Sequence, residues 1–233
     1  MTPEALAHAQ SDIDREVCGL FVIRKGREEY VPCRNVAEHP ANDFTIDPED
    51  WVKADAIGEI VGVFHSHPRS RPLPTQPDLV SCERSGLPWT IANPRTEEVH
   101  TFEPSGYEAP MYGREYCHGV LDCYSFVRDF YKQEHGVELR EYEREDEWWL
   151  KGFDLYKDYM QAEGFYPIDL ANMKPGDGII MNIASDVGNH GAIYLGDGQM
   201  AHHLYQRLSS RDIYGGYYQK HTLLVVRHKE LNN

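Results

Sequence analysis

Short apolar runs separated by turn residues fill the first part of the chain. The run over 17–23 is rich in β-branched and aromatic residues and turns at Lys25-Gly26, which predicts a hairpin that returns through Tyr30-Val31. The run over 60–64 is too short for a helix and predicts a buried strand. Two more strands are predicted over 88–92 and 98–102.

Helix-start signals lie between these strands. Thr2-Pro3-Glu4 predicts a helix that ends near Arg15, and Asp47-Pro48 opens a second helix. Pro77-Asp78 starts a short third one. This alternation of helix, hairpin, helix, strand, helix and hairpin predicts one α/β unit.

The later part of the chain has a different pattern. Apolar or aromatic residues follow a helical period from Cys123 to Tyr131, with Asp122 as the N-cap. An acidic and aromatic stretch over 141–165 predicts a long amphipathic helix broken at Gly152.

Residues 104–113 contain two prolines and two glycines without apolar periodicity, which is typical of a linker. We therefore expect a chain of mixed α/β (α+β) class with one domain over 1–103 and another over 114–233.

Composition and charge narrow the function classes. The 233 residues are 41% hydrophobic, and 38 acidic against 23 basic residues give a net charge of −15. This balance argues against a nucleic-acid surface and against a polybasic membrane face. The N-terminus lacks the pattern of a signal peptide, and no stretch approaches the roughly 18 apolar residues of a membrane span. We expect a protein made in the cytoplasm without a signal peptide, with no nucleic-acid partner and no integral membrane segment.

Two histidines follow the strand predicted over 60–64. Side chains two apart on a strand share a face, so His65 and His67 can reach one metal ion from the same side. Prolines in the following loop forbid helix and central strand, and this loop can return Asp78 as a third ligand. Three protein ligands leave a fourth zinc position open to water, whose pKa falls to about 7 there, which is the layout of a hydrolytic site.

A general base completes such a layout. Glu16 stands where the first helix gives way to a buried strand, and a buried glutamate must be paired or neutralised. A solvated surface charge is the alternative for a single glutamate.

Glu16, His65-Ser66-His67-Pro68 and Asp78, in this order, resemble the JAMM (JAB/MPN) metalloprotease motif. The resemblance implies that His65, His67 and Asp78 hold Zn²⁺ and that Glu16 is the base. Thr75 stands where the family usually has serine, so its hydroxyl would donate to the developing oxyanion.

A second candidate centre begins at Cys123. The chain has five cysteines, an odd number that argues against a disulfide framework. A thiol in the first turn of a helix meets the positive end of the helix dipole, which favours the thiolate. A small core cysteine is the alternative. His190 is a candidate base for the thiol, and a second histidine would orient its imidazole.

Strand parity selects that second histidine. Gly196-Asp197-Gly198 is a strong turn signal. A three-residue loop pairs Ala192 with His202 and places His202 on the face of His190, whereas a two-residue loop selects His203. We prefer His202 and keep His203 as the alternative.

This part of the chain resembles the NlpC-type cell-wall cysteine peptidases, on Asp122-Cys123-Tyr124-Ser125, Lys174-Pro175-Gly176-Asp177 and the run that begins at His190. The resemblance implies a papain-like domain whose antiparallel sheet packs on the catalytic helix, with a Cys-His-His triad. Phe126 departs from the family pattern, which usually has glycine there. A tyrosine upstream of the cysteine lines the site in this family, and Tyr112 and Tyr116 are both candidates.

The two domains in this order, with the run His118–Ser125, resemble the phage tail-tip assembly protein K family. The resemblance implies a tail-tip component that acts with other phage tail-tip proteins. It also implies cleavage of peptidoglycan stem peptides at the D-glutamyl to diaminopimelate amide, with an unidentified substrate for the zinc domain. Two alternatives stay open, a structural tail-tip protein with vestigial sites and a cytoplasmic zinc-dependent processing protease.

Overall fold

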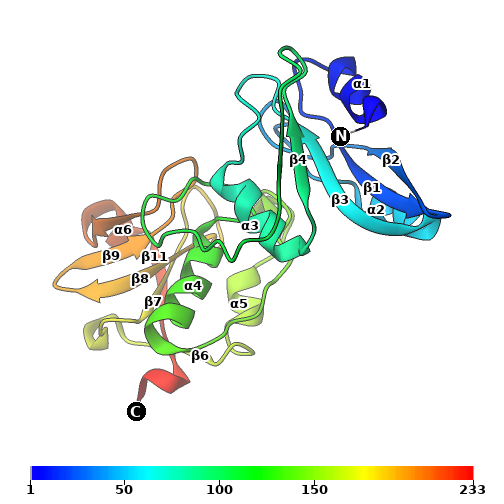
Figure 1. Ribbon diagram of the computed structural model, residues 1–233. Helices are drawn as coiled ribbons and strands as arrows, with labels where there is room; N and C mark the ends of the chain where they lie inside the picture. Colours follow the sequence, from blue (N-terminus) through cyan, green and yellow to red (C-terminus); the bar gives the residue numbers. More distant parts are fainter. Residues whose placement is uncertain (1, 233) are drawn as a thin grey trace. The chain divides into compact units, whose positions relative to one another are not determined.

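A computed structural model describes residues 2–232 of the chain (Figure 1). The chain forms two compact units, Met1–Glu108 and Ala109–Asn233, and the linker predicted over 104–113 spans the division between them. In the described part of the chain, no helix combines the length and the apolar character that a membrane crossing needs.

The first unit is built on a five-stranded sheet with the strand order β2-β1-β3-β4-β5. Neighbouring strands are antiparallel except β3 and β4, which are parallel and are joined through a helix. The strands are β1 Cys18–Arg24, β2 Arg27–Cys33, β3 Glu59–Ser66, β4 Trp89–Ala92 and β5 Val99–Phe102, and the helices are α1 Pro3–Ser11, α2 Pro48–Ile57 and α3 Gln76–Ser85.

Helices cover both faces of this sheet. Leu20 and Val63 face one side, where Ala54 of α2 and Cys82 of α3 pack against them. Phe21, Phe64 and other residues of the opposite face pack against Ala5 and Ala9 of α1. The sheet is therefore buried on two sides, which explains why its central strands are almost continuously apolar.

Helix α1 is shorter than predicted and ends at Ser11 rather than near Arg15. The Asp12 carboxylate accepts hydrogen bonds from the backbone N–H groups of Asp14 and Arg15. This local turn competes with the helical hydrogen bonds and ends the helix.

The second unit is built on a six-stranded antiparallel sheet with the order β10-β9-β8-β7-β11-β6. Its strands are β6 Phe165–Ile168, β7 Gly178–Met181, β8 His190–Gly196, β9 Gln199–His202, β10 Ser210–Ile213 and β11 Thr222–His228. Its helices are α4 Cys123–His135, α5 Leu155–Tyr159 and α6 Gly216–Lys220, with short 3₁₀ turns η1 Trp148–Leu150, η2 Leu170–Asn172 and η3 Lys229–Asn232.

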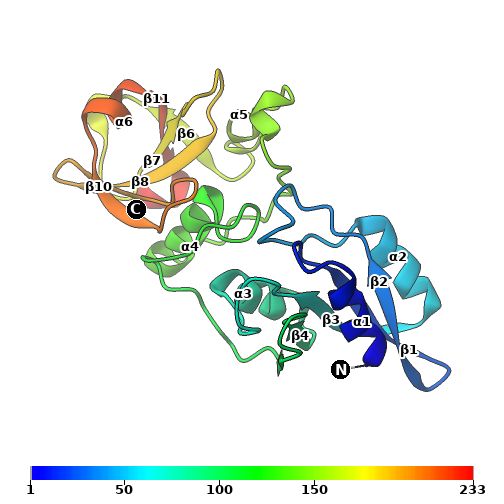
Figure 2. The same ribbon diagram turned by 90° about the horizontal axis from the view of Figure 1, so that it is seen from above.

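Helix α4 packs on this sheet through its apolar face (Figures 1 and 2). Val127, Phe130 and Tyr131 meet Ile180 of β7 and Ile193 of β8. The other face of the sheet has its own core, which contains Ile179, Met181, Ala192, Met200 and Tyr214. An antiparallel sheet packed on the helix that begins at Cys123 confirms the predicted fold class, a mixed α/β chain of two domains.

The long amphipathic helix predicted over 141–165 is wrong. Only η1 and the five-residue α5 are helical there. Glu147 and Gly152 have φ values of 50° and 86°, in the left-handed region that interrupts a right-handed helix. The segment instead wraps the start of α4, where the Arg144 guanidinium donates to both carboxylate oxygens of Asp122, at 2.9 and 3.3 Å.

Candidate active sites

The first site is assembled by hydrogen bonds between the Glu16 segment and the end of β3. The Val17 N–H donates to Ser66 Oγ, and the Ser66 N–H donates to the Val17 carbonyl, both at 3.0 Å. Ser66 stands between His65 and His67, whose side chains point to the other face. These two bonds therefore bring Glu16, the residue before Val17, beside the two imidazoles.

The nitrogen and oxygen atoms of this site converge on one point. His65 Nε2 lies 3.1 Å from His67 Nε2 and 3.3 Å from Asp78 Oδ1, and His67 Nε2 lies 3.6 Å from Asp78 Oδ2. Tetrahedral ligands at the usual zinc distances lie about 3.3 Å apart, so these three side chains fit one zinc ion. Glu16 brings a carboxylate oxygen within 4.8 Å of both imidazole ligand atoms.

The surroundings of the two histidines suit metal ligation. His67 Nδ1 lies 3.2 Å from the Arg71 carbonyl, which can accept only if Nδ1 carries the proton. The Nε2 lone pair of His67 is then free to face the site. The His65 ring is fully buried and stacked on Phe44 at 4.3 Å between ring centres.

The two carboxylates of the site differ in proton affinity. Burial raises the pKa of Glu16 to about 9, and the negative charges of Asp78 and Asp43 add to the effect. Burial also opposes ionisation of Asp78, but His65 and the hydrogen bonds from His65 and Thr75 bring its pKa down to about 2. Asp78 is therefore anionic at neutral pH, as a metal ligand needs to be, whereas Glu16 is suited to holding a proton.

Thr75 supports Asp78 in this structure. It is the N-cap of α3, and its hydroxyl accepts from the Asp78 N–H and donates to Asp78 Oδ2 at 2.7 Å. The hydroxyl is thus engaged with a predicted zinc ligand, and its role toward an oxyanion stays a prediction.

The second site begins at the N-terminus of α4. The Asp122 carboxylate caps this helix by accepting from the Ser125 N–H, which places Cys123 in the first turn as predicted. Cys123 Sγ lies 3.5 Å from Tyr156 Oη and 3.9 Å from the carbonyl oxygen of Asn189. The backbone N–H group of Gly191 lowers the pKa of this thiol.

The thiol therefore meets the backbone on both sides of His190. Among the described residues, no hydrogen bond joins Cys123 Sγ directly to the His190 ring, and catalytic hydrogen bonds are often long before substrate binds.

The imidazole of His190 belongs to a line of polar groups that leads away from the thiol. His190 Nε2 lies 2.9 Å from His202 Nδ1, and His202 Nε2 lies 3.0 Å from Asp212 Oδ2. Both histidines are buried. His203 points elsewhere, with its Nε2 3.0 Å from the carbonyl of Arg207 and its ring against Tyr116. The structure thus brings His202, rather than His203, to His190.

The hairpin reaches this arrangement by an unexpected route. The loop between β8 and β9 has two residues, Asp197 and Gly198, both with positive φ, which is the form that by strand parity alone selects His203. A bulge at Leu195 shifts the register, and Ala192 pairs with His202 all the same. A bulge adds one residue to one strand, which has the same effect on parity as a longer loop.

The predicted thiolate of Cys123 is also wrong for the resting protein. Burial raises the pKa of the Cys123 thiol, and the negative charge of Asp122 raises it further. Burial, together with His202 and His203, lowers the pKa of His190 to about 3. The resting pair is therefore a neutral thiol and a neutral imidazole.

Sequence reasoning missed Tyr156, whose hydroxyl contacts the Cys123 thiol. It comes from α5, inside the segment predicted as a long helix, and no spacing rule links it to Cys123. A methyl group on Gly191 would lie 2.6 Å from Tyr156 Oη, so glycine at this position makes room for the hydroxyl. Of the two upstream tyrosines, Tyr116 has its pKa raised by burial and by Cys123, which indicates that it lies near the thiol. Tyr112 packs against Phe126.

Comparison with known proteins gives two domain matches and full-length relatives. Residues 1–104 match the model for prokaryotic homologs of the JAB domain, and residues 113–227 match that of the NlpC/P60 family. Tail tip assembly protein K of Escherichia phage N15 is 35% identical over 228 residues, which cover 97% of this chain and 93% of that protein. This chain belongs to the tail tip assembly protein K family. Its counterpart from Escherichia phage lambda is 39% identical over 184 residues, 79% of this chain and 89% of that protein.

The resemblances stated from sequence are therefore confirmed at the level of family and domains. Both domains of this tail tip assembly protein K family member belong to peptidase families. The first domain is also 33% identical to a desampylase of Pyrococcus furiosus over 99 residues, 40% of this chain and 70% of that protein.

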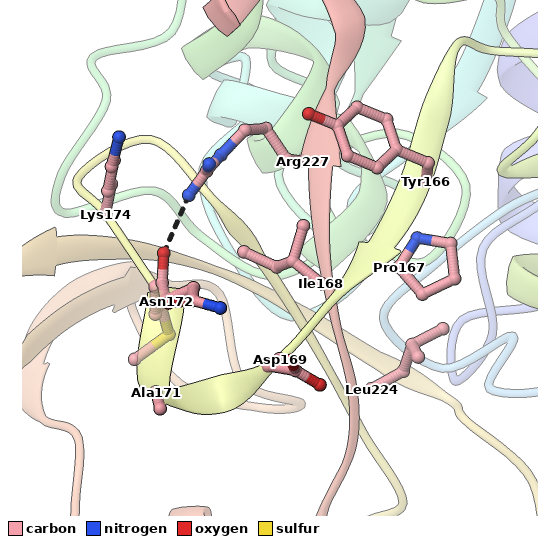
Figure 3. A pocket seen from close by; sticks show the side chains of 10 residues that line it. Tyr166, Pro167, Ile168, Asp169, Ala171, Asn172, Lys174, Leu224 and Arg227 are labelled. Carbon is pink, nitrogen blue, oxygen red and sulfur yellow. Dashed lines mark hydrogen bonds between the residues drawn. The ribbon is translucent and has the colours of Figure 1, made fainter.

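A further pocket of the second unit lies beside β6 and β11 (Figure 3). The Arg227 guanidinium that lines it donates to the Asn172 carbonyl at 2.9 Å, drawn as a dashed line in Figure 3, and to both carboxylate oxygens of Asp177. Asp177 is the buried end of the Pro-Gly-Asp turn. This arginine is therefore engaged in fixing the turn, and none of the predicted site residues lines the pocket.

Proposed function

We propose that this protein is a component of the phage tail tip that opens the host cell wall by cutting peptidoglycan stem peptides. Cys123 would be the nucleophile, His190 the base and His202 the residue that orients His190. The carrying observation is the line of Cys123 contacts and histidine hydrogen bonds at the start of α4, within an NlpC/P60 domain of a tail-tip protein family. Other tail-tip proteins would be its assembly partners, and the protein would be made in the host cytoplasm.

In the first chemical step, Cys123 Sγ attacks the carbonyl carbon of the scissile amide. The thiol proton passes to His190 Nδ1, because Nε2 is engaged with His202. The developing oxyanion is stabilised by backbone N–H groups at the start of α4, where the helix dipole is positive. His190 then gives its proton to the leaving amine, the C–N bond breaks, and a thioester with Cys123 remains.

In the second step, His190 takes a proton from water, and the resulting hydroxide attacks the thioester carbonyl. The C–S bond breaks and the proton returns to the sulfur, which restores the enzyme and releases the carboxylate product. We assign the cut to the amide between D-glutamate and diaminopimelate, as the resemblance to the NlpC-type peptidases implies.

We also propose that the first domain is a zinc peptidase that processes a protein. Its donor set fits Zn²⁺, with His65, His67 and Asp78 as ligands, and the desampylase resemblance supports this reading. Zinc bound there would polarise the amide carbonyl and lower the pKa of water. Glu16, which has a carboxylate oxygen beside the two imidazole ligand atoms, would take the proton of that water and pass it to the leaving amine.

The wall-hydrolase proposal is tested by digesting purified cell-wall sacculi with the full chain and reading the released fragments by mass spectrometry. The wild-type protein should release stem-peptide fragments that begin with diaminopimelate and leave D-glutamate as the new carboxyl end on the glycan strands, and Cys123→Ala should release none. Cys117→Ala, which changes a half-buried cysteine of the same domain, is the matched control and should act like the wild type. Equal release by wild type and Cys123→Ala would refute the assignment of the nucleophile.

Absence of release by the wild type, with zinc bound and the fold intact, would favour a structural tail-tip role.

The zinc proposal has its own test in the metal content of protein purified without chelator. We expect about one zinc per chain in the wild type and in the control His100→Ala, and almost none in His67→Ala.

A further inference from the structure

Beyond the three residues of the proposed triad, the line of hydrogen bonds in the second domain continues to a carboxylate. His202 Nε2 lies 3.0 Å from Asp212 Oδ2 on β10. The Tyr218 hydroxyl of α6 donates to the same oxygen at 3.2 Å, and its ring meets the edge of His202 with 5.2 Å between centres. Asp212 is therefore held from two sides against the far nitrogen of His202.

The direction of the protons along this line follows from the chemistry of each group. A neutral imidazole has one N–H donor and one acceptor nitrogen. An ionised carboxylate only accepts, so the proton of His202 must be on Nε2, which donates to Asp212. His202 Nδ1 is then an acceptor, and the hydrogen bond of 2.9 Å requires that His190 Nε2 carries the proton. His190 Nδ1 is left without a proton and can take one from the thiol.

The opposite direction would disable the site. If His202 carried its proton on Nδ1, it would donate to His190 Nε2, and the His190 proton would move to Nδ1. His190 Nδ1 would then already carry a proton and would have no lone pair with which to accept the proton of Cys123. The Asp212 carboxylate at one end of the line thus determines whether His190 Nδ1, at the other end, can accept a proton.

We propose that Asp212 is a positioning residue that fixes the tautomers of both histidines and keeps His190 Nδ1 free to act as a base. This inference rests on the proposed cysteine peptidase function. Asp212 acts through His202 and has no contact with the thiol among its recorded interactions.

The charges around His202 agree with a neutral ring. Burial lowers the pKa of His202, although Asp212 opposes this effect, and Arg207 lowers the pKa as well. The titratable and charged groups that face His202 are His190 from β8, Asp212 from β10, Tyr218 from α6 and Arg207 from the β9–β10 loop. With the ring neutral near pH 7, the place of its single proton matters for catalysis.

The first test is the tautomer itself in the full wild-type chain. Long-range ¹H–¹⁵N NMR of ¹⁵N-histidine-labelled protein distinguishes a protonated from an unprotonated ring nitrogen. We expect Nε2–H for both His190 and His202 at pH 7. A proton on Nδ1 of His202 in the wild type would overturn the proposal without any variant or substrate.

The second test compares Asp212→Asn with Asp197→Asn, a matched change in the β8–β9 turn. An asparagine amide can donate to His202 Nε2 and so stabilise the wrong tautomer. We expect Asp212→Asn to shift the His202 proton to Nδ1 and to lower kcat on a stem peptide about a hundredfold, with KM unchanged. Asp212→Glu should recover much of the loss, and Asp197→Asn should match the wild type.

A readout that needs no peptide substrate separates this proposal from the function on which it rests. The rate of Cys123 alkylation by iodoacetamide, measured from pH 5 to 10, should rise at a higher pH in Asp212→Asn than in Asp197→Asn. Suppose that the wild type cleaves no stem peptide, but Asp212→Asn still shifts both the His202 tautomer and the pH of alkylation relative to Asp197→Asn. This result would refute the proposed function and leave the role of Asp212 intact. Identical tautomers and identical alkylation profiles in the two variants would overturn the role of Asp212.

Discussion

The two sites of this protein place similar side chains in opposite arrangements. In the first domain, His65, His67 and Asp78 direct their polar atoms at one point, with separations of 3.1 to 3.6 Å. In the second domain, hydrogen bonds join His190 to His202 and His202 to Asp212 in a line. Ligand atoms that point at one place are suited to holding a cation between them. A line of hydrogen-bond donors and acceptors needs no cation, but every group in it must donate in the same direction.

The electrostatics follow the same division. Two buried carboxylates meet in the first site, and one of them, Glu16, is held protonated at neutral pH in the absence of a cation. In the second site the buried thiol and imidazole are neutral at rest, with the pKa of His190 lowered and that of Cys123 raised. Metal should therefore matter strongly for the stability of the first domain and not for the second.

The largest expected effect is on the first domain when its metal is removed and returned. Zinc at about 1,000 times its dissociation constant stabilises a folded domain by about 4 kcal/mol. In calorimetry of the chelator-treated full chain, added zinc should shift the unfolding transition of the first domain to a higher temperature, as this gain in free energy requires. The transition of the second domain should not move. The same titration of His67→Ala should move neither transition. A zinc response retained by His67→Ala would contradict the assigned ligands.

Glu16→Gln should stabilise the metal-free first domain. Burial raises the pKa of Glu16 from 4.5 to about 9, so between these values the folded state keeps a proton that the unfolded state has lost. The free energy of unfolding therefore falls as the pH rises from about 4.5 toward 9, by about 3 kcal/mol at pH 7. Chemical denaturation of chelator-treated Glu16→Gln should lack this fall. Glu28→Gln, on the exposed strand β2, should retain it, and parallel curves for both variants would refute the buried charge.

Tyr156→Phe should weaken the second site by a smaller amount. A hydrogen bond to a charged group contributes about 1.5 kcal/mol, so loss of the hydroxyl should slow thiolate formation at Cys123 about tenfold near neutral pH. The measurement is iodoacetamide alkylation of Cys123 as a function of pH, in which the apparent pKa should rise by about one unit. Tyr159→Phe in the same short helix serves as the control. A faster alkylation in Tyr156→Phe would instead identify the tyrosine as a cover over the thiol.

The smallest expected effect concerns Thr75. Loss of an N-cap hydroxyl costs about 1 kcal/mol of stability, so Thr75→Val should lower the free energy of unfolding of the first domain by this amount. Thr75→Ser keeps both hydrogen bonds with Asp78 and should be neutral in stability and zinc content. If Thr75→Val were as stable as the wild type, the hydroxyl would not carry the effect.

Sequence reasoning succeeded where the chemistry is local. The pair His65 and His67 follows from strand periodicity, and the caps at Asp47 and Asp122 follow from helix-start signals. Asp78 follows from the proline-rich loop after the histidines, whereas Glu16 lies far from them in sequence and only the resemblance to a motif joined it to them as the base.

The failures occurred where tertiary contacts override local patterns. The aromatic stretch over 141–165 wraps the start of α4 through Arg144, and no periodicity announces such a path. The bulge at Leu195 is likewise invisible in composition. The dipole argument for Cys123 was outweighed by burial. Sequence reasoning could have found Asp212 once His202 was paired across β9 and β10. Its partner there is Ser210, and Asp212 lies two residues further along the same strand.

We propose that the two sites work separately, the first with a bound metal ion and the second through its line of hydrogen bonds. The most direct measurement is zinc content and stem-peptide release on the same preparations of wild type, His67→Ala and Cys123→Ala. We predict that His67→Ala loses zinc and keeps peptide release, and that Cys123→Ala keeps zinc and loses release. Loss of peptide release in His67→Ala, with the second domain still folded, would contradict the account.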